Sequence, residues 1–151
     1  MSTPALPLVY VLNGPTLNLL GTREPEIYGS HTLANIEQLV REKAEVLGLA
    51  IVFRQTNHEG VLIDWLHEAH ERGAKAVLLN AAAYTHTSIA LLDAVKAIVP
   101  PVIEVHLSDP AAREAFRHHS WVGMAAVCEV KGLGAQSYIV ALEQAAALLA
   151  R

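Results

Sequence analysis

The chain has a single cysteine and few aromatic residues, and both shortages narrow what it can do. Because Cys128 is the only cysteine among 151 residues, neither an intrachain disulfide nor a paired-cysteine metal or redox site can form. Aromatic residues make up 5% of the chain, too few for the stacking platforms that single-stranded nucleic acids use. We therefore interpret Cys128 as a small hydrophobic side chain and expect no nucleic-acid partner.

Long apolar runs and an excess of positive charge are also missing. No stretch approaches the roughly 18 consecutive apolar residues of a membrane span. The first residues lack the basic start of a secretory signal peptide. A formal net charge of −4 offers no general attraction to nucleic acids or anionic membranes. These absences predict a cytoplasmic protein without a membrane partner.

Apolar residues make up 52% of the chain, and they fall in short runs that alternate with segments of helical period. Strands are expected at residues 8–13, 49–55, 74–80, 101–107 and 124–130, and helices at residues 32–48, 59–73, 86–101, 109–119 and 135–151. Five consecutive strand–helix units predict an α/β fold with a flavodoxin-like, doubly wound sheet of five parallel strands. No linker or repeat divides the chain, so we expect one domain over residues 1–151.

Polar residues stand at the ends of the predicted strands. In doubly wound folds, ligands bind outside the carboxyl ends of the strands, near the point where the strand order reverses. The polar residues at those ends are Asn13, Gln55, Asn57, Asn80, Glu104, His106 and Ser108. Their convergence on one edge of the sheet predicts a binding site there.

A polar loop, LLGTREPEIYGSHT (residues 19–32), follows the first strand and carries Arg23 and Tyr28. A phenol ordinarily has a pKa of about 10, so a tyrosine that acts as a base needs a nearby cation to keep it ionised. Arg23 is the obvious candidate for that role toward Tyr28. The alternative is that Tyr28 only packs the loop while Arg23 is solvated.

The segment IEVHLSD places Glu104, His106 and Ser108 on one face of a strand, because successive side chains of a strand alternate. A carboxylate beside an imidazole fixes its tautomer and keeps it protonated, as a general acid requires. The alternative is a purely structural hydrogen bond. Leu107 and Ser108 begin the next predicted helix, where backbone N–H groups suit an anion.

Arg113 and Arg117 lie four residues apart, on one face of the predicted helix 109–119. Such a pair holds a carboxylate, forms the hinge of a lid or simply faces solvent. The adjacent His118 and His119 lack the spacing of metal ligands, so no metal site is expected. Glycine-rich phosphate motifs are absent, and no lysine lies at the predicted carboxyl edge, which argues against nucleotide and imine chemistry.

Five blocks of the sequence together resemble type II 3-dehydroquinate dehydratases, in the same order and almost from end to end. The blocks are LNGPTLNLLGTREPEIYG, FRQTNHEGVLIDWLHEA, LNAAAYTHTSIALLDAV, IEVHLSDPAAREAFRHHS and KGLGAQSYIVAL. The resemblance implies a cofactor-free hydro-lyase that converts 3-dehydroquinate to 3-dehydroshikimate by anti elimination through an enolate. It also implies a homo-oligomer, a dodecamer built from trimers. The pathway is either aromatic biosynthesis or quinate breakdown.

The resemblance also gives roles to individual residues. It implies that Tyr28 removes the proton beside the ketone and that Arg23 keeps Tyr28 ionised. His106, beside Glu104, is implied to protonate the leaving hydroxyl, and Asn13 matches the group that supports the tyrosine and a bound water. Substrate-binding positions match Asn80, His86, Leu107, Ser108, Arg113, Arg117 and Asp93, the last reaching the site of a neighbouring subunit.

We expect residues 19–30 to form a mobile lid over this site. The competing interpretation is a non-catalytic flavodoxin-like module that binds phosphate or flavin or has a regulatory role. The first strand–helix loop lacks the hydroxyl-rich phosphate cradle that a flavin site needs, and the strand ends lack a cluster of acidic phospho-acceptors. These features favour the enzyme.

Two short segments depart from the pattern of that family. Thr16 stands where members often have Asn, and Ala81-Ala82 stand where they often have Pro-Gly. A position of positive φ costs an alanine ~1–2 kcal/mol relative to glycine. We therefore expect the backbone from Ala81 to Ala83, and its contact with the substrate, to differ in this chain.

Overall fold

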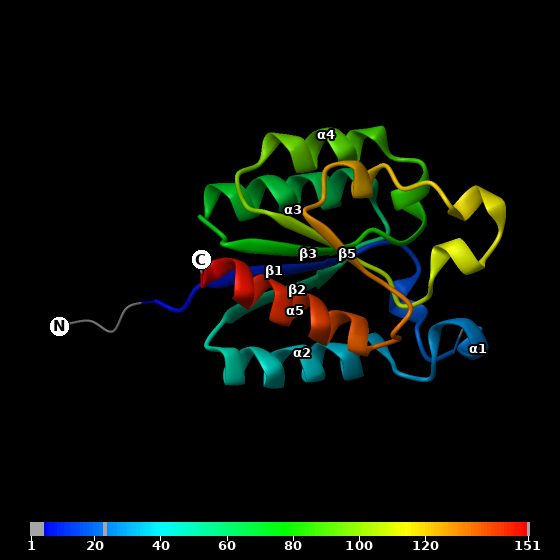
Figure 1. Cartoon of the computed structure of the whole chain (residues 1–151), viewed down its shortest axis with the longest axis horizontal. Coiled ribbons are helices and arrows are strands. Elements are labelled where there is room, and N and C mark those ends of the chain that lie inside the picture. The colour runs from blue at the N-terminus through cyan, green and yellow to red at the C-terminus, as the bar shows by residue number, and fades with distance from the viewer. Residues whose placement is uncertain (1–4, 23, 151) are drawn as a thin grey trace.

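A computed structural model describes residues 5–22 and 24–150, and a five-stranded sheet runs through its centre (Figure 1). The strands are β1 (Leu8–Asn13), β2 (Ala50–Gln55), β3 (Ala76–Asn80), β4 (Val102–Val105) and β5 (Cys128–Val130). All neighbours are parallel, and their order is β2-β1-β3-β4-β5. This order is the flavodoxin-like one, which confirms the predicted fold and puts the switch point between β1 and β3.

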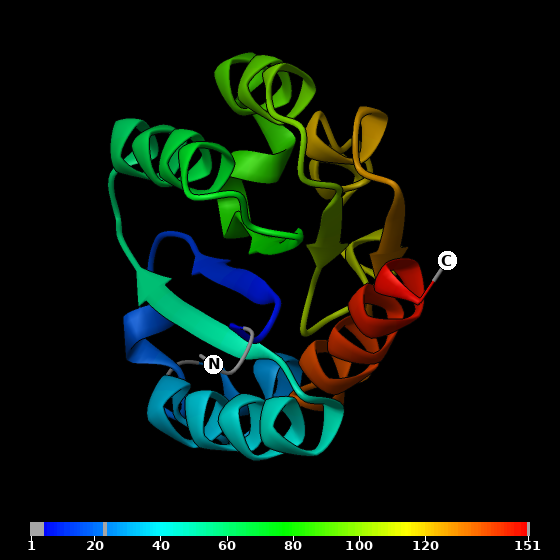
Figure 2. The ribbon, with the colours of Figure 1, turned by 90° about the vertical axis from the view of Figure 1, so that its left-hand side faces the viewer.

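Two helices cover each face of the sheet (Figures 1 and 2). One layer holds α2 (Leu33–Leu47) and α5 (Gln136–Leu149), and the other holds α3 (Glu59–Glu71) and α4 (Ile89–Ala97). The one-turn helix α1 (Pro25–Tyr28) lies beyond the carboxyl ends of the strands. Over the described ranges, no helix is long and apolar enough to cross a membrane.

The helix α2 shows how the sequence sets these boundaries. The Oγ1 of Thr32 accepts a hydrogen bond from the backbone N–H of Asn35, and the side chain of Asn35 accepts one from the N–H of Thr32. Such a reciprocal pair satisfies amides that a helix start leaves open. Gly48, with a φ of 72°, ends α2 where the sequence predicted a stop.

The first strand contributes to both halves of the core. Val9 and Val11 pack on the α2 and α5 side, while Tyr10 and Leu12 pack on the α3 and α4 side. These four side chains are fully buried. A strand covered on both faces needs this continuous apolar run, which is the pattern that predicted the parallel sheet.

The predicted helix 109–119 is wrong. The structure has two short 3-10 helices there, Pro110–Ala112 and Ala115–Arg117, and extended backbone at Arg113 between them. None of the six helical residues, all described, is buried, so no apolar face stabilises a longer helix. Arg113 and Arg117 therefore do not share a face of one α-helix.

Two further elements are shorter than predicted. The strand expected over residues 124–130 begins only at Cys128, because Val122–Met124 form a 3-10 helix. The helix expected over residues 86–101 begins at Ile89, because the Oγ of Ser88 caps it by accepting a hydrogen bond from Leu91. The preceding Ala82–His86 form another 3-10 helix, and so do Leu17–Leu19 beside the first loop.

Candidate active site

A pocket opens at the carboxyl edge of the sheet, where the polar strand ends predicted a site. It has a cavity volume of about 120 Å³. Eight predicted site residues line it: Tyr28, Asn80, His86, His106, Leu107, Ser108, Arg113 and Arg117. The other lining residues are Pro15, Thr16, Leu17, Ala82, Ala83 and Pro110. The structure thus brings together side chains from loops that follow three different strands.

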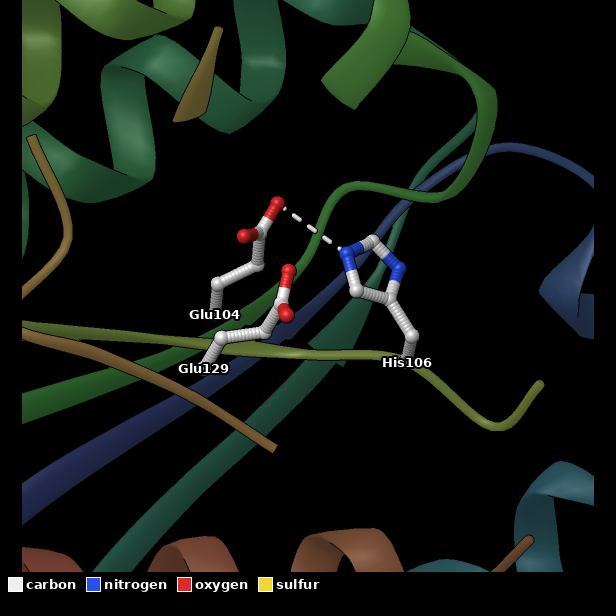
Figure 3. Close-up of side chains that lie close together, drawn as sticks. All are labelled: Glu104, His106 and Glu129. Carbon is white, nitrogen blue, oxygen red and sulfur yellow. Dashed lines mark ion pairs between the residues drawn. The ribbon is translucent and has the colours of Figure 1, made fainter. Parts of the chain in front are cut away.

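Glu104 lies behind His106 and is held by hydroxyl groups. Its Oε2 accepts hydrogen bonds from the Oγ1 of Thr85, at 2.6 Å, and from the Oγ of Ser120. The same oxygen lies 3.0 Å from the Nε2 of His106 (Figure 3). The side chains of Glu104 and His106 are only 1% and 7% exposed, so the pair is shielded from water.

This environment keeps Glu104 ionised. Burial raises the pKa of Glu104, but the imidazole of His106 and the hydroxyls of Ser120 and Thr85 together outweigh burial and hold that pKa well below its usual range. Glu104 is therefore a carboxylate at neutral pH. A buried carboxylate therefore lies directly beside the imidazole of His106 at the edge of the pocket.

Sequence reasoning missed the roles of Thr85 and Ser120. Ser88 caps α4, while the hydroxyl of Thr85 turns to Glu104. The hydroxyls of Thr85 and Ser120 are also 2.8 Å apart. No spacing rule points to these partners, because they come from loops 19 and 16 residues from Glu104 along the chain.

Asn80 and Asn13 are joined through a buried tyrosine that the sequence did not single out. The Nδ2 of Asn80 donates to the Oη of Tyr138, at 2.9 Å, and that hydroxyl donates to the Oδ1 of Asn13, at 2.6 Å. The Nδ2 of Asn13 donates to the carbonyl of Arg54. Asn13 is fully buried and does not line the pocket, so it contacts the site through Tyr138 and Asn80.

Tyr28 lies against a cation from another segment. The guanidinium carbon of Arg113 lies 5.1 Å from the centre of the Tyr28 ring. The Nη1 of Arg113 is 3.4 Å from the Oγ of Ser108, and its Nε is buried without a hydrogen-bond partner among the described residues. Arg113 thus has a donor available at the pocket wall. Arg23, the predicted partner of Tyr28, lies outside the described residues.

His86 and Arg117 line the pocket beside the loop that carries Ser120. The Nδ1 of His86 donates to the carbonyl of His119 at 2.8 Å, since a carbonyl only accepts. Burial lowers the pKa of His86, which favours the neutral ring with an accepting Nε2. The Nε of Arg117 donates to Glu114. His86 and Arg117 thus supply a hydrogen-bond acceptor and a cation at one wall of the pocket.

The predicted anion site at Leu107 and Ser108 keeps its donors available. The carbonyls of these two residues accept hydrogen bonds from Gly134 and Gly132. Within residues 5–22 and 24–150, their own backbone N–H groups have no hydrogen-bond partner. No helix begins at these two residues, but because both line the pocket, their amides can donate to an anion bound there.

Asp93 lies apart from this pocket. It stands on α4, exposed to solvent, and does not line the cavity. His86 belongs to the preceding 3-10 helix, so it does not share a helix with Asp93. Within this single chain, Asp93 has no contact with the site residues described above.

Both segments that depart from the family pattern carry strain at the pocket wall. Thr16 has a φ of 69° and Ala82 a φ of 52°, in the left-handed region. Such conformations are costly for residues with a Cβ, above all for a β-branched one. The expected conflict at Ala81 to Ala83 thus falls on Ala82, whose backbone N–H donates to the Oδ1 of Asn80.

Comparison with known proteins gives a consistent result. A family model described as dehydroquinase class II matches residues 7–146. The 3-dehydroquinate dehydratase of Maricaulis maris (strain MCS10) is 60% identical over 137 residues, covering 91% of this chain and 93% of that protein. A similar relative from Acidovorax sp. (strain JS42) is 60% identical over 139 residues, which cover 89% of this chain and 94% of that relative.

Solved structures agree with the sequence comparisons. The type II dehydroquinase from Propionibacterium acnes has a TM-score of 0.91 at 41% identity, covering 96% of this chain and 99% of that chain. The type II dehydroquinase from Butyrivibrio crossotus DSM 2876 has a TM-score of 0.92 at 34% identity, covering 94% of this chain and 99% of that chain. The likeness therefore extends over the whole domain, including the carboxyl edge.

Proposed function

Since the chain belongs to the class II dehydroquinase family, we propose that it is a hydro-lyase that removes water from 3-dehydroquinate to give 3-dehydroshikimate. The observation that carries this proposal is the single pocket that Tyr28 and His106 both line, with the buried Glu104 behind His106. It offers a base, an acid and cations for a substrate carboxylate. Elimination from a hydroxy ketone needs these three elements.

The first step is proton removal by Tyr28. The phenolate oxygen takes the proton from the carbon beside the ketone, and the electron pair of that bond moves onto the ketone oxygen to form an enolate. The position of Arg113 against the ring, 5.1 Å from its centre, supports this role because a cation favours the phenolate. Arg23 is the second proposed cation beside Tyr28.

The second step is loss of the hydroxyl with the help of His106. The enolate electrons form the new carbon–carbon double bond, the carbon–oxygen bond breaks, and the leaving oxygen takes a proton from the imidazolium to depart as water. The Nε2 of His106 faces Glu104, and its Nδ1 lies on the far side of the ring (Figure 3). We assign the transferred proton to Nδ1, while Glu104 stabilises the charged ring.

The remaining pocket groups bind the substrate. The amides of Leu107 and Ser108 and the unpartnered Nε of Arg113 suit its carboxylate. The neutral His86 accepts from a substrate hydroxyl, and Arg117 adds positive charge at the same wall. Asn80 lines the pocket and is fixed by Tyr138, which ties it to Asn13. Asn13 is proposed to support the tyrosine through this network and a bound water.

We further propose that residues 19–30 close over the pocket when the substrate binds. The segment contains the short helix α1, and Tyr28 at its end lines the cavity.

The assembly proposed by resemblance, a dodecamer of trimers, would bring the exposed Asp93 of one subunit toward the site of another. Light scattering of the purified protein tests the assembly. A cytoplasmic location and a cofactor-free reaction belong to the same proposal.

One assay tests the reaction directly. Purified protein, given 3-dehydroquinate and no added cofactor, is expected to produce the ultraviolet absorbance of a conjugated enone. Treatment with borohydride during turnover is expected to leave no adduct on lysine, since the described lining of the pocket contains none. No absorbance change at any pH from about 6 to about 9, a range set by ordinary histidine and tyrosine ionisation, would contradict the proposal.

A further inference from the structure

A third titratable side chain lies beside Glu104 and His106, and the proposed reaction does not use it. Glu129 on β5 is the register partner of Glu104 on β4, so the two carboxylates share one face of the sheet. Ligand atoms from Glu104, His106 and Glu129 all lie within 4.8 Å of one another. Figure 3 shows the Nε2 of His106 turned toward the side of the ring where both carboxylates lie.

Two buried atoms of this cluster lack hydrogen bonds. The Oε1 of Glu104 and the Nε2 of His106 have no hydrogen-bond partner among residues 5–22 and 24–150. Nε2 is 3.0 Å from the Oε2 of Glu104, but that approach lacks the direction of a hydrogen bond. Leaving a buried polar atom without a hydrogen bond is unfavourable, so a ligand that engages it is favoured.

We propose that Glu104, His106 and Glu129 form a binding site for a divalent transition-metal ion, with zinc as the best fit, and that the bound ion inhibits the enzyme. Imidazole nitrogen and carboxylate oxygen bind zinc at about 2.0–2.2 Å, which places the ligand atoms of a tetrahedral site roughly 3.4 Å apart. Atoms within 4.8 Å of one another need a modest closure to reach that spacing. Rotation of the Glu129 side chain, which is 35% exposed, supplies this closure.

The charges around the cluster favour a cation. The carboxylates of Glu129 and Asp109 lie on either side of Lys131. The Nζ of Lys131 is 3.1 Å from Glu129 and 3.7 Å from Asp109. The ammonium of Lys131 therefore competes with a metal ion for Glu129. The side of the His106 ring that faces Glu129 thus carries the carboxylates of Glu104, Glu129 and Asp109 and the ammonium of Lys131, while Arg113 and Arg117 line the pocket with His106.

Inhibition follows from the roles given to His106 and Glu104, so this part of the inference rests on the proposed function, whereas binding does not. A metal ion on Nε2 occupies the nitrogen that faces Glu104 and uses the carboxylate that stabilises the imidazolium. The ring then keeps one proton, on Nδ1, and giving it up would leave an imidazolate. The acid step therefore slows when the ion is bound.

The test compares zinc binding with zinc inhibition in the full chain, prepared without a histidine tag. Isothermal titration calorimetry measures binding, and initial rates on 3-dehydroquinate at rising zinc concentrations measure inhibition. Glu129→Gln removes one ligand, and we expect at least about tenfold weaker binding and inhibition with unchanged activity in the absence of zinc. Lys131→Met removes the competing ammonium, and we expect both zinc effects to strengthen.

Glu143→Gln is the matched control. Glu143 is an exposed glutamate on α5 that pairs with Lys43 at 3.8 Å, as Glu129 pairs with Lys131. Its zinc response is expected to equal that of the wild type. Zinc binding by Glu129→Gln that equals the wild type, or no binding by the wild type, would overturn the site.

Binding that depends on Glu129 but leaves the rate unchanged would overturn the inhibitory role. The activity of the wild type without zinc is a separate readout. If that activity is absent while Glu129-dependent binding is present, the proposed function fails and the metal site stands.

Discussion

The two sides of the pocket are built in different ways. His106 directly follows β4, and its partner Glu104 is fixed by hydroxyls from two loops. Tyr28 ends the four-residue helix α1, none of whose described residues is buried. Its cationic neighbour Arg113 stands between two short 3-10 helices. Segments with few buried contacts open at low cost, so the side of the proposed acid, His106, is fixed and the side of the proposed base, Tyr28, is free to move. We call these the acid side and the base side.

The largest effect is expected from a substitution on the base side alone. Tyr28→Phe removes the phenolic oxygen, and we expect kcat to fall by about 10²- to 10⁴-fold because proton transfer contributes on that scale. Thermal stability should change little, since α1 has few buried contacts. Steady-state kinetics and thermal unfolding measure both quantities.

Tyr84→Phe serves as the control for this change. The hydroxyl of Tyr84 donates to the carbonyl of Asn57 at 2.8 Å, and Tyr84 does not line the pocket. The Tyr84→Phe variant should therefore keep a normal kcat. Near-normal kcat in Tyr28→Phe would show that another group is the base.

A change on the acid side is expected to lower activity and stability together. Glu104→Gln replaces an acceptor of two hydroxyl hydrogen bonds by an amide, and the unmatched groups cost about 1–3 kcal/mol of unfolding free energy. The same change removes the charge that stabilises His106, so kcat should also fall. Urea unfolding and kinetics together measure the double loss. A fall in kcat with full stability would contradict the contrast between the two sides.

The pH dependence of stability sharpens the same contrast. The pKa of Glu104 is lower in the folded chain, about 2, than its ordinary value of 4.5. Its stabilising contribution is therefore complete above pH 4.5 and is lost as the pH falls toward 2. Urea unfolding of the wild type should show a loss across this range that Glu104→Gln lacks. Parallel curves for the two proteins would mean that Glu104 is not held as a buried carboxylate.

The smallest effect concerns the wall between the two sides. Ala82 has a φ of 52°, so Ala82→Gly should stabilise the fold by about 0.5–1 kcal/mol, the relief of strain less the entropy that glycine adds. Ala83 belongs to the same 3-10 helix and has no positive φ. Ala83→Gly should therefore destabilise the fold by about 0.5–1 kcal/mol. If thermal unfolding showed stability changes of the same sign in both variants, this would contradict the strain at Ala82.

The sequence predicted the sheet and the pocket edge because both follow from local patterns. Apolar runs such as residues 74–80 identified strands, and the polar residues that follow them, among them Asn80 and His106, identified the edge. The helix 109–119 failed because periodicity does not tell whether an apolar face will be covered.

The remaining misses are contacts made across the fold. Thr85 and Ser120 reach Glu104 from separate segments of the chain. Tyr138 on α5 joins the two asparagines Asn13 and Asn80. Glu129 meets Glu104 only because β4 and β5 pair in one register. Such partners depend on tertiary packing, which local spacing in one sequence does not encode. Asn13 shows the same limit, since the sequence marks its place at a strand end but not its burial.

The buried hydroxyl of Tyr138 also gives the chain an internal optical reporter. Tyr138 is fully buried, and burial raises its pKa far above the usual range for a phenol. At high pH this residue therefore gains the ultraviolet absorbance of a phenolate only when α5 separates from β1 and β3. An alkaline absorbance titration would thus report the opening of the wall behind the pocket, without any dye or label.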